Sequence, residues 1–261
     1  MTTPMLTFLI TVLAFFCFWL VQVKTKDAGV VDIFWGPGFA VIVFIYVALH
    51  PNTTLWNCII AIITNIWAIR LGFHMGMRHH KSKSEDRRYA LMRSNNETSF
   101  WWSSLYKVFL LQAVLMWIIA SSQHAAFSIT ENSGQPIILS LFLFGLGLFV
   151  AGFTLETVAD YQLSKFKSDS QNAGKTMNQG LWAWSRHPNY FGEMVIWWGF
   201  GFCGFAVSGA WWAFVGPALL TFLLLRVSGV TLMEKHLLPE KEGYEAYVKN
   251  TSALIPLPPK R

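Results

Sequence analysis

One stretch of the sequence is rich in residues that could bind a ligand or take part in catalysis. It ends at Glu193, lies between two apolar regions and reads Gln-Gly-Leu-Trp-Ala-Trp-Ser-Arg-His-Pro-Asn-Tyr-Phe-Gly-Glu. Pro188 is favoured in the first turn of a helix, so a helix is predicted to begin there. The N–H groups at that helix start, beside Arg186 and His187, are suited to binding an anion. Asn189 and Glu193 are four residues apart and share one helix face. A basic loop that only marks the end of a membrane helix would leave Glu193 unexplained.

Ionisable side chains also interrupt other apolar segments, where they are costly and usually face a cavity or a partner. These residues are Asp32, Arg70, Glu156, Glu193 and Arg226, with Arg78 and Asp160 at the rim. Arg70, His74 and Arg78 repeat every four residues, which predicts one polar helix stripe. The alternative is a set of structural ion pairs, such as Glu156 with Arg226 or Asp32 with Arg70. The pattern favours a cavity that opens to the cytoplasm, where it admits an anionic cofactor, and that is apolar above, where it admits a lipid-like substrate.

The elements that must hold these residues are membrane helices, because 54% of the 261 residues are hydrophobic and 13% are charged. We expect an all-α integral membrane protein with seven transmembrane helices, near residues 4–23, 30–50, 54–74, 104–122, 136–158, 190–208 and 210–229. The first segment lacks the flanks of a signal peptide and is expected to stay as a helix. The three cysteines lie in apolar segments without ligand spacing, so neither a disulfide nor a metal site is predicted.

Lys and Arg residues indicate the orientation of these helices, since they accumulate in cytoplasmic loops. They follow the first, third, fifth and seventh segments, whereas the connections at 51–54, 121–135 and 208–209 contain none. The N-terminus is therefore predicted to be outside and the C-terminus cytoplasmic. The tail 232–261 is predicted to form a short interfacial helix and an extended strap.

The sequence contains neither a strand–Gly-x-Gly-x-x-Gly–helix unit nor a P-loop, which argues against a soluble nucleotide-binding fold. Because the basic residues serve membrane topology, no nucleic acid is expected as a partner. We expect the lipid bilayer and a hydrophobic small molecule as partners, and a monomer.

Several motifs together resemble the bacterial members of the steroid 5α-reductase family. They are Ser185-Arg-His-Pro-Asn-Tyr-Phe-Gly-Glu193 with Trp197-Trp198-Gly199, Asp32-Ile-Phe-Trp-Gly36, Arg70-Leu-Gly72, Glu85-Asp86-Arg87-Arg88-Tyr89 and the ending Tyr244…Tyr247…Thr251…Ile255-Pro256. The resemblance covers nearly the whole chain. It implies one seven-helix reductase domain over 1–261, with N-terminal helices and a basic loop to about 103 and a cofactor-binding half from about 104. It also implies a bacterial inner membrane and NADPH-dependent reduction of the Δ4 double bond of 3-oxo steroids.

The resemblance also assigns roles to single residues. Asn189 and Glu193 match the Asn and Glu of the family's Asn-Phe-Leu-Gly-Glu motif, at the cofactor and substrate. Asp160 matches a cofactor contact, and Asp32 lies near the position of a catalytic Glu. The family's proton-donating Tyr has no match, because the third segment contains no Tyr. A carboxyl group in an apolar cavity can stay protonated and donate to the enone oxygen, so Asp32 and Glu193 are the expected catalytic residues, with Tyr89 a weaker candidate.

The expected contacts to NADPH combine the motif with the basic loop, whose arginines suit the pyrophosphate and 2′-phosphate. They are Arg78, Arg87, Arg88, Asp160, Lys165, Trp182, Arg186, His187, Asn189, Tyr190, Arg226 and Tyr244. Two alternatives remain open. Isoprenylcysteine carboxyl methyltransferases share the Arg-His-Pro-x-Tyr core and use S-adenosylmethionine, and a lipid-binding or transport protein would need no cofactor. The surplus of Lys and Arg from Arg78 to Arg93 favours the phosphate-rich cofactor.

Overall fold

The computed structural model describes residues 2–51, 53–82, 85–96, 98–128, 136–227 and 243–259. These ranges are mostly helical, as expected for an all-α chain. The chain forms two compact units. Unit 1 contains Met1–Pro136 with Val207–Ala210, and unit 2 contains Ile137–Ala206 with Trp211–Arg261.

Six helical stretches of the described chain are long and apolar enough to cross a membrane. They are α1 (Thr3–Thr25), α2 (Val30–Leu49), α3 (Leu55–Ser82), the stretch Phe100–Ile119, α8 (Leu139–Ser168) and α9 (Pro188–Ser208). The predicted multi-pass character is therefore confirmed for six segments, and α9 begins at the predicted proline.

The seventh predicted span is a shorter apolar helix, Trp211–Val227. It consists of η5 (Trp211–Phe214), α10 (Val215–Phe222) and the π-helical η6 (Leu223–Val227). At 1.5 Å per residue it is about 25 Å long, less than the roughly 30 Å of hydrocarbon. Residues 228 and 229 of the predicted segment lie outside the described residues, so a seventh span stays a prediction.

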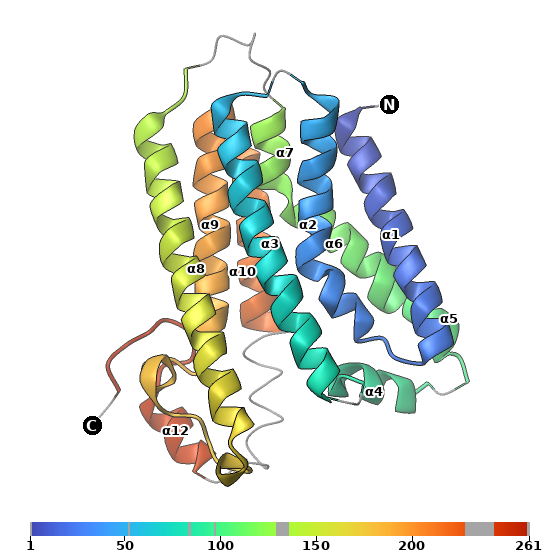
Figure 1. Cartoon of the computed structure of the whole chain (residues 1–261), viewed down its shortest axis with the longest axis vertical. Helices are drawn as coiled ribbons and strands as arrows, with labels where there is room; N and C mark the ends of the chain where they lie inside the picture. Colours follow the sequence, from blue (N-terminus) through green and yellow to red (C-terminus); the bar gives the residue numbers. More distant parts are fainter. Residues whose placement is uncertain are drawn as a thin grey trace. The chain divides into compact units, whose positions relative to one another are not determined.

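Unit 1 is built on α1, α2 and α3, which run side by side from blue to teal (Figure 1). Small residues allow α2 and α3 to approach closely. A Cβ atom on Gly36 of α2 would lie 2.7 Å from the carbonyl oxygen of Ala68, and one on Gly72 of α3 would lie 2.8 Å from the ring of Pro37. The next helices are α5 (Phe100–Ser104), the π-helical η1 (Leu105–Leu110) and α6 (Leu111–Ile119).

Two segments of unit 1 that were expected to be loops are helical. The basic segment contains α4 (Arg87–Ser94), which begins after Asp86 because that carboxylate accepts a hydrogen bond from the backbone N–H of Arg88. The expected connection 121–135 begins with α7 (Ser121–Phe127), whose residues are all buried. Its polar sequence is typical of a loop, but its side chains face the interior of the fold.

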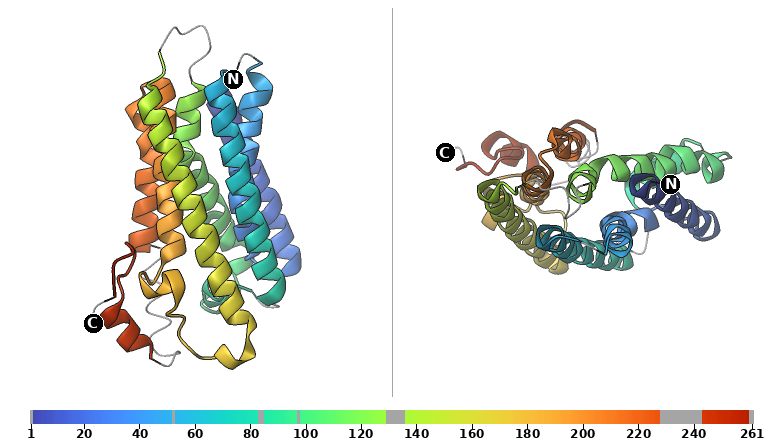
Figure 2. Two further views of the ribbon diagram at one scale, coloured as in Figure 1. Left: turned by 60° about the vertical axis from the view of Figure 1, so that its left-hand side comes forward. Right: turned by 90° about the horizontal axis from the view of Figure 1, so that it is seen from above.

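In unit 2, α8 and α9 (yellow-green and orange) run side by side, as two views show (Figure 2). Paired glycines bring them together: a Cβ atom on Gly145 would lie 2.7 Å from the carbonyl oxygen of Gly199, and one on Gly152 would lie 2.6 Å from that of Gly192. The turns η3 (Ser170–Asn172) and η4 (Gly180–Ala183) follow α8, and α12 (Tyr244–Asn250) begins the described part of the tail.

Candidate functional site

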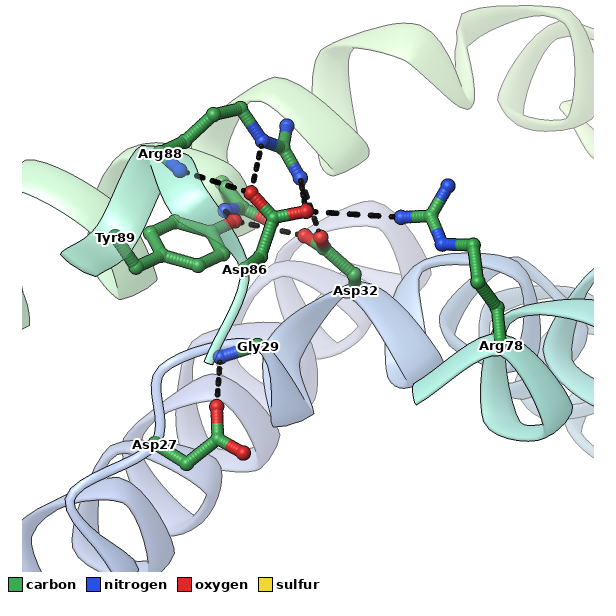
Figure 3. Close-up of polar contacts among 8 residues, drawn as sticks. Asp27, Gly29, Asp32, Arg78, Asp86, Arg88 and Tyr89 are labelled. Atoms are coloured by element: carbon green, nitrogen blue, oxygen red, sulfur yellow. Dashed lines mark hydrogen bonds and ion pairs between the residues drawn. The ribbon is translucent and has the colours of Figure 1, made fainter. Parts of the chain in front are cut away.

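The first candidate site lies in unit 1, at the start of α2, where the carboxylate of Asp32 receives two side-chain hydrogen bonds. The hydroxyl of Tyr89 donates to Oδ1 over 2.7 Å, and Nη2 of Arg88 donates to Oδ2 over 2.5 Å (Figure 3). Both donors come from α4. The structure thus joins two of the three expected catalytic residues, Asp32 and Tyr89, in one contact. It also places Arg88, expected at the cofactor, in an ion pair with Asp32.

Asp86, the N-cap of α4, holds Arg88 in position. Its Oδ1 accepts from Nε of Arg88 over 2.9 Å as well as from the backbone N–H over 3.0 Å, and Arg78 lies 3.8 Å from its other oxygen. Burial by itself would raise the pKa of Asp86, but hydrogen bonds and charge from Arg88, with the charge of Arg78, hold it below its usual range. The guanidinium of Arg88 therefore bridges two carboxylates.

A second set of contacts holds α4 to the connection between α1 and α2. Glu85 accepts from the backbone N–H of Ala28 over 2.8 Å and from Arg93 over 2.7 and 3.0 Å. Arg93 also donates to the carbonyl oxygen of Lys26 over 2.9 Å. These contacts explain why α4 stays beside the first turn of α2, where Tyr89 can reach Asp32.

Gln112 of α6 completes this site, because its Nε2 donates to the hydroxyl of Tyr89 over 3.2 Å. Sequence reasoning missed Gln112, which looks like one polar residue in an apolar span. Burial, with the charge of Asp32 next, raises the pKa of Tyr89. The phenol therefore stays neutral at ordinary pH and can donate a hydrogen bond.

The second candidate site lies in unit 2, at the start of α9. Nδ2 of Asn189 donates to Oδ1 of Asp160 on α8 over 3.1 Å, so two expected cofactor contacts are adjacent. One turn further along α9, Glu193 is 9% exposed and accepts from the indole N–H of Trp197 over 3.0 Å. His187 is buried and its ring stacks on Tyr190, with 5.3 Å between the ring centroids.

The segment before α9 is fastened by the C-terminal tail. The hydroxyl of Tyr247 on α12 donates to the carbonyl oxygen of Trp182 over 2.5 Å, and Ser185 donates to that of Leu254 over 2.7 Å. Nη1 of Arg186 donates to the carbonyl oxygens of Val248 and Thr251 over 2.8 and 2.6 Å. The tail thus forms the predicted helix and strap in its described part, and Arg186, expected at the phosphates, also holds that strap.

The remaining expected cofactor residues divide by burial. Tyr244 is buried on α12, next to the ring of Tyr247. The cations Arg78, Arg87, Lys165 and Arg226 are exposed.

The chemistry of the Asp160–Asn189 pair can be compared with that of NADPH. A carboxylate beside an amide matches the hydroxyl and amide groups of a nicotinamide riboside, so the residues fit that part of the cofactor. Lys165, exposed on α8, is a candidate for a phosphate.

Comparisons with known proteins agree with this picture at a coarse level. The chain is 30% identical to 3-oxo-5-alpha-steroid 4-dehydrogenase 1 of Rattus norvegicus over 115 residues. These residues make up 44% of this chain and 41% of that relative. The human protein of the same name is 29% identical, with the same coverage. The chain thus matches less than half the length of these relatives. An uncharacterized protein of Schizosaccharomyces pombe is 26% identical over 219 residues, which cover 73% of this chain and 61% of that protein.

No solved structure matches the chain. The similarities do not favour the methyltransferase alternative. Residues 18–251 match a family described as a protein of unknown function, DUF1295. Because that match extends over most of the sequence, the chain belongs to the DUF1295 family.

Proposed function

We propose that this protein is a membrane reductase that uses NADPH to reduce the Δ4 double bond of a 3-oxo steroid or a similar lipid enone. The observation that carries the proposal is the phenol of Tyr89, held between the carboxylate of Asp32 and the amide of Gln112. The partial similarity to 3-oxo-5-alpha-steroid 4-dehydrogenases supports the same reaction class.

Reduction of an enone needs a hydrogen-bond donor at the carbonyl oxygen, where negative charge develops as the hydride is added to the β-carbon. Tyr89 is the donor in this proposal: its O–H donates to Asp32 in the ligand-free protein and to the enone oxygen once the substrate is bound, and a proton from solvent then adds to the α-carbon of the enolate. In the ligand-free protein Asp32 accepts from both Tyr89 and Arg88, so in this proposal it is a carboxylate that holds Tyr89 in position until the substrate binds. Gln112 keeps the phenol oxygen in place during this exchange.

Bound NADPH would supply the hydride. In unit 2, Asn189 and Asp160 would hold the nicotinamide–ribose part, and Glu193 would face the reacting ring. The strap that Arg186 and Tyr247 fasten would keep the start of α9 ordered. Cations at the cytoplasmic rim, Lys165 among them, would bind the phosphates.

The proposal includes a bacterial inner-membrane protein with its N-terminus outside, its C-terminus in the cytoplasm and a seventh span. Positions 52 and 133, in connections without Lys or Arg, lie outside the described residues and suit single-cysteine labelling. In a background without native cysteines, both should react with an impermeant maleimide on intact cells. Labelling only after permeabilisation would indicate the opposite orientation, with the N-terminus in the cytoplasm.

The function is tested on purified protein by binding of NADPH, NADH and S-adenosylmethionine, followed by NADPH oxidation with progesterone. Tyr89→Phe should lower kcat by about 100-fold or more and leave NADPH binding unchanged, because removing one hydrogen-bond donor to a developing oxyanion costs a factor of about 10²–10³. Asp32→Asn should lower kcat less. Tyr106→Phe, at an exposed tyrosine of unit 1, is the matched control and should keep full activity.

Two results would contradict the proposal. S-adenosylmethionine binding without NADPH binding would replace the reductase by a methyltransferase. A Tyr89→Phe variant with the turnover of Tyr106→Phe would remove Tyr89 from the mechanism.

A further inference from the structure

A second group of buried polar side chains lies in unit 1, away from Asp32. Gln123 of α7 is fully buried, and in the described part of the chain neither Oε1 nor Nε2 has a hydrogen-bond partner. The same is true of Oδ1 of Asn57 and Oγ1 of Thr64, on α3, whose residues are 2% and 0% exposed. A buried polar group without a partner is unfavourable, so such groups usually bind a ligand or an ordered water.

The polar groups beside them are satisfied. Nε2 of His124 lies 3.0 Å from the carbonyl oxygen of Trp117, which can only accept, so this nitrogen carries the proton. Nδ1 therefore accepts from the hydroxyl of Tyr46 over 2.8 Å. Trp117 in turn donates to Thr7 of α1 over 3.2 Å. Burial lowers the pKa of His124 to about 4, so this neighbour of Gln123 is neutral at pH 7.

Helical spacing relates this group to the Tyr89 site. Gln112 shares one face of α6 with Met116 and Ile119, and Gln123 follows on α7, after the break between the two helices at Ala120. Both of these apolar side chains are fully buried. On α2, Asp32 and Tyr46 likewise share a face, with the buried residues Phe39 and Val43 between them.

Each of these two stretches thus carries a polar residue before and after buried apolar side chains. At 1.5 Å per residue the two ends are about 21 Å apart along α2, and the eleven residues of α6 and α7 cover about 16 Å. The helix α3, which carries Asn57 and Thr64, packs against both α2 and α7. The tetracyclic nucleus of a steroid is shorter than either length.

We propose that Gln123, with Thr64, binds a neutral hydroxyl or carbonyl group at the far end of the lipid substrate. The inference rests on the proposed function for the enone end of that lipid. An amide offers both a donor and an acceptor, and Thr64 adds a hydroxyl, so a hydroxyl group roughly 16–20 Å from the enone oxygen can satisfy them. The preferred substrate is therefore an elongated lipid enone with a second polar group, and not a bare steroid nucleus.

The test compares two probes, cholest-4-en-3-one and 25-hydroxycholest-4-en-3-one, which differ by one distal hydroxyl. Affinity is measured by quenching of tryptophan fluorescence, which needs no NADPH. The wild-type protein should bind the hydroxylated probe about tenfold more tightly. That probe forms a hydrogen bond with the amide of Gln123, whereas the other probe leaves the amide desolvated and without a partner. Gln123→Met, which keeps the length of the side chain but removes the amide, should abolish this preference.

Thr64→Val is the second variant, should Gln123→Met fail to fold, and it should reduce the preference. Thr157→Val is the matched control, because Oγ1 of Thr157, on α8 of unit 2, is also buried and has no hydrogen-bond partner among the described residues. It should leave the preference unchanged. The melting temperature of ligand-free Gln123→Met should stay the same or rise, since an unsatisfied amide has been removed.

Equal affinity of the wild-type protein for both probes would overturn the inference. So would a Gln123→Met variant that keeps the preference, or one that only loses thermal stability, as expected if an ordered water satisfies the amide. Failure of the function gives a different result: the hydroxylated probe binds preferentially, yet neither probe supports NADPH oxidation. Oxidation with both probes at equal KM would instead keep the reductase and remove the distal site.

Discussion

Gly192 offers a sharp test of how the unit 2 site is positioned. A Cβ atom there would lie 2.6 Å from the backbone nitrogen of Glu156 and 2.8 Å from the carbonyl oxygen of Gly152. Ordinary contacts of a Cβ atom begin at 3.4 Å. Both neighbours are backbone atoms of α8, so they cannot rotate away, and Gly192→Ala must move α9 from α8 by roughly 0.8 Å.

The displacement has two measurable consequences. Overpacking at a helix contact costs about 1–3 kcal/mol, and each kcal/mol lowers the melting temperature by roughly 2–4 °C in a chain of this size. The hydrogen bond from Asn189 to Asp160, 3.1 Å long, would stretch beyond the accepted limit. NADPH affinity should then fall by about tenfold, given the proposed role of that pair.

The matched control is Gly147→Ala on α8, where a Cβ atom would meet no atom of the described residues within 4 Å. Alanine is a better helix former than glycine by up to about 1 kcal/mol, so this variant should be unchanged or slightly more stable. Both variants are measured by thermal unfolding in detergent with intrinsic fluorescence. Equal melting temperatures for the two would refute the claim that α8 and α9 touch through their backbones at Gly192.

Two further predictions concern the tail and the cap of α4. Tyr247→Phe should remove the 2.5 Å hydrogen bond to the carbonyl oxygen of Trp182 and speed amide hydrogen exchange in 181–187. Tyr161→Phe, at an exposed position, is the control and should not change the exchange. Equal exchange in both variants would argue against the proposed role of Tyr247 in holding the tail. Asp86 should contribute stability above its unfolded pKa of about 3.9, which is lost as pH falls through its lower folded pKa. Asp86→Asn keeps the N-cap acceptor and should therefore lose less stability than wild type between pH 5 and about pH 2; parallel losses would contradict the charge interaction with Arg88.

Much of the architecture follows from the sequence because membrane helices are specified locally. A long apolar run satisfies its own backbone hydrogen bonds wherever it is placed in hydrocarbon, so six spans could be predicted from composition and length. The start of α9 was also specified locally, since Pro188 is tolerated in the first turn of a helix but not in the helix interior. The spacing of Asn189 and Glu193 then placed both on one face without any tertiary information.

Pairings between distant segments were decided only by the tertiary structure. Asp32 and Tyr89 are 57 positions apart, and nothing local to either residue shows that Glu85 and Arg93 bring α4 to the start of α2. Arg88 and Arg186 look alike as cations in basic segments, yet one holds a carboxylate and the other holds the C-terminal strap. The polar segment 121–127 reads as a loop, because the sequence does not reveal which side of a short helix will be covered. Local propensity and hydropathy act within a few residues, whereas the partner of a buried polar group depends on which helices pack together.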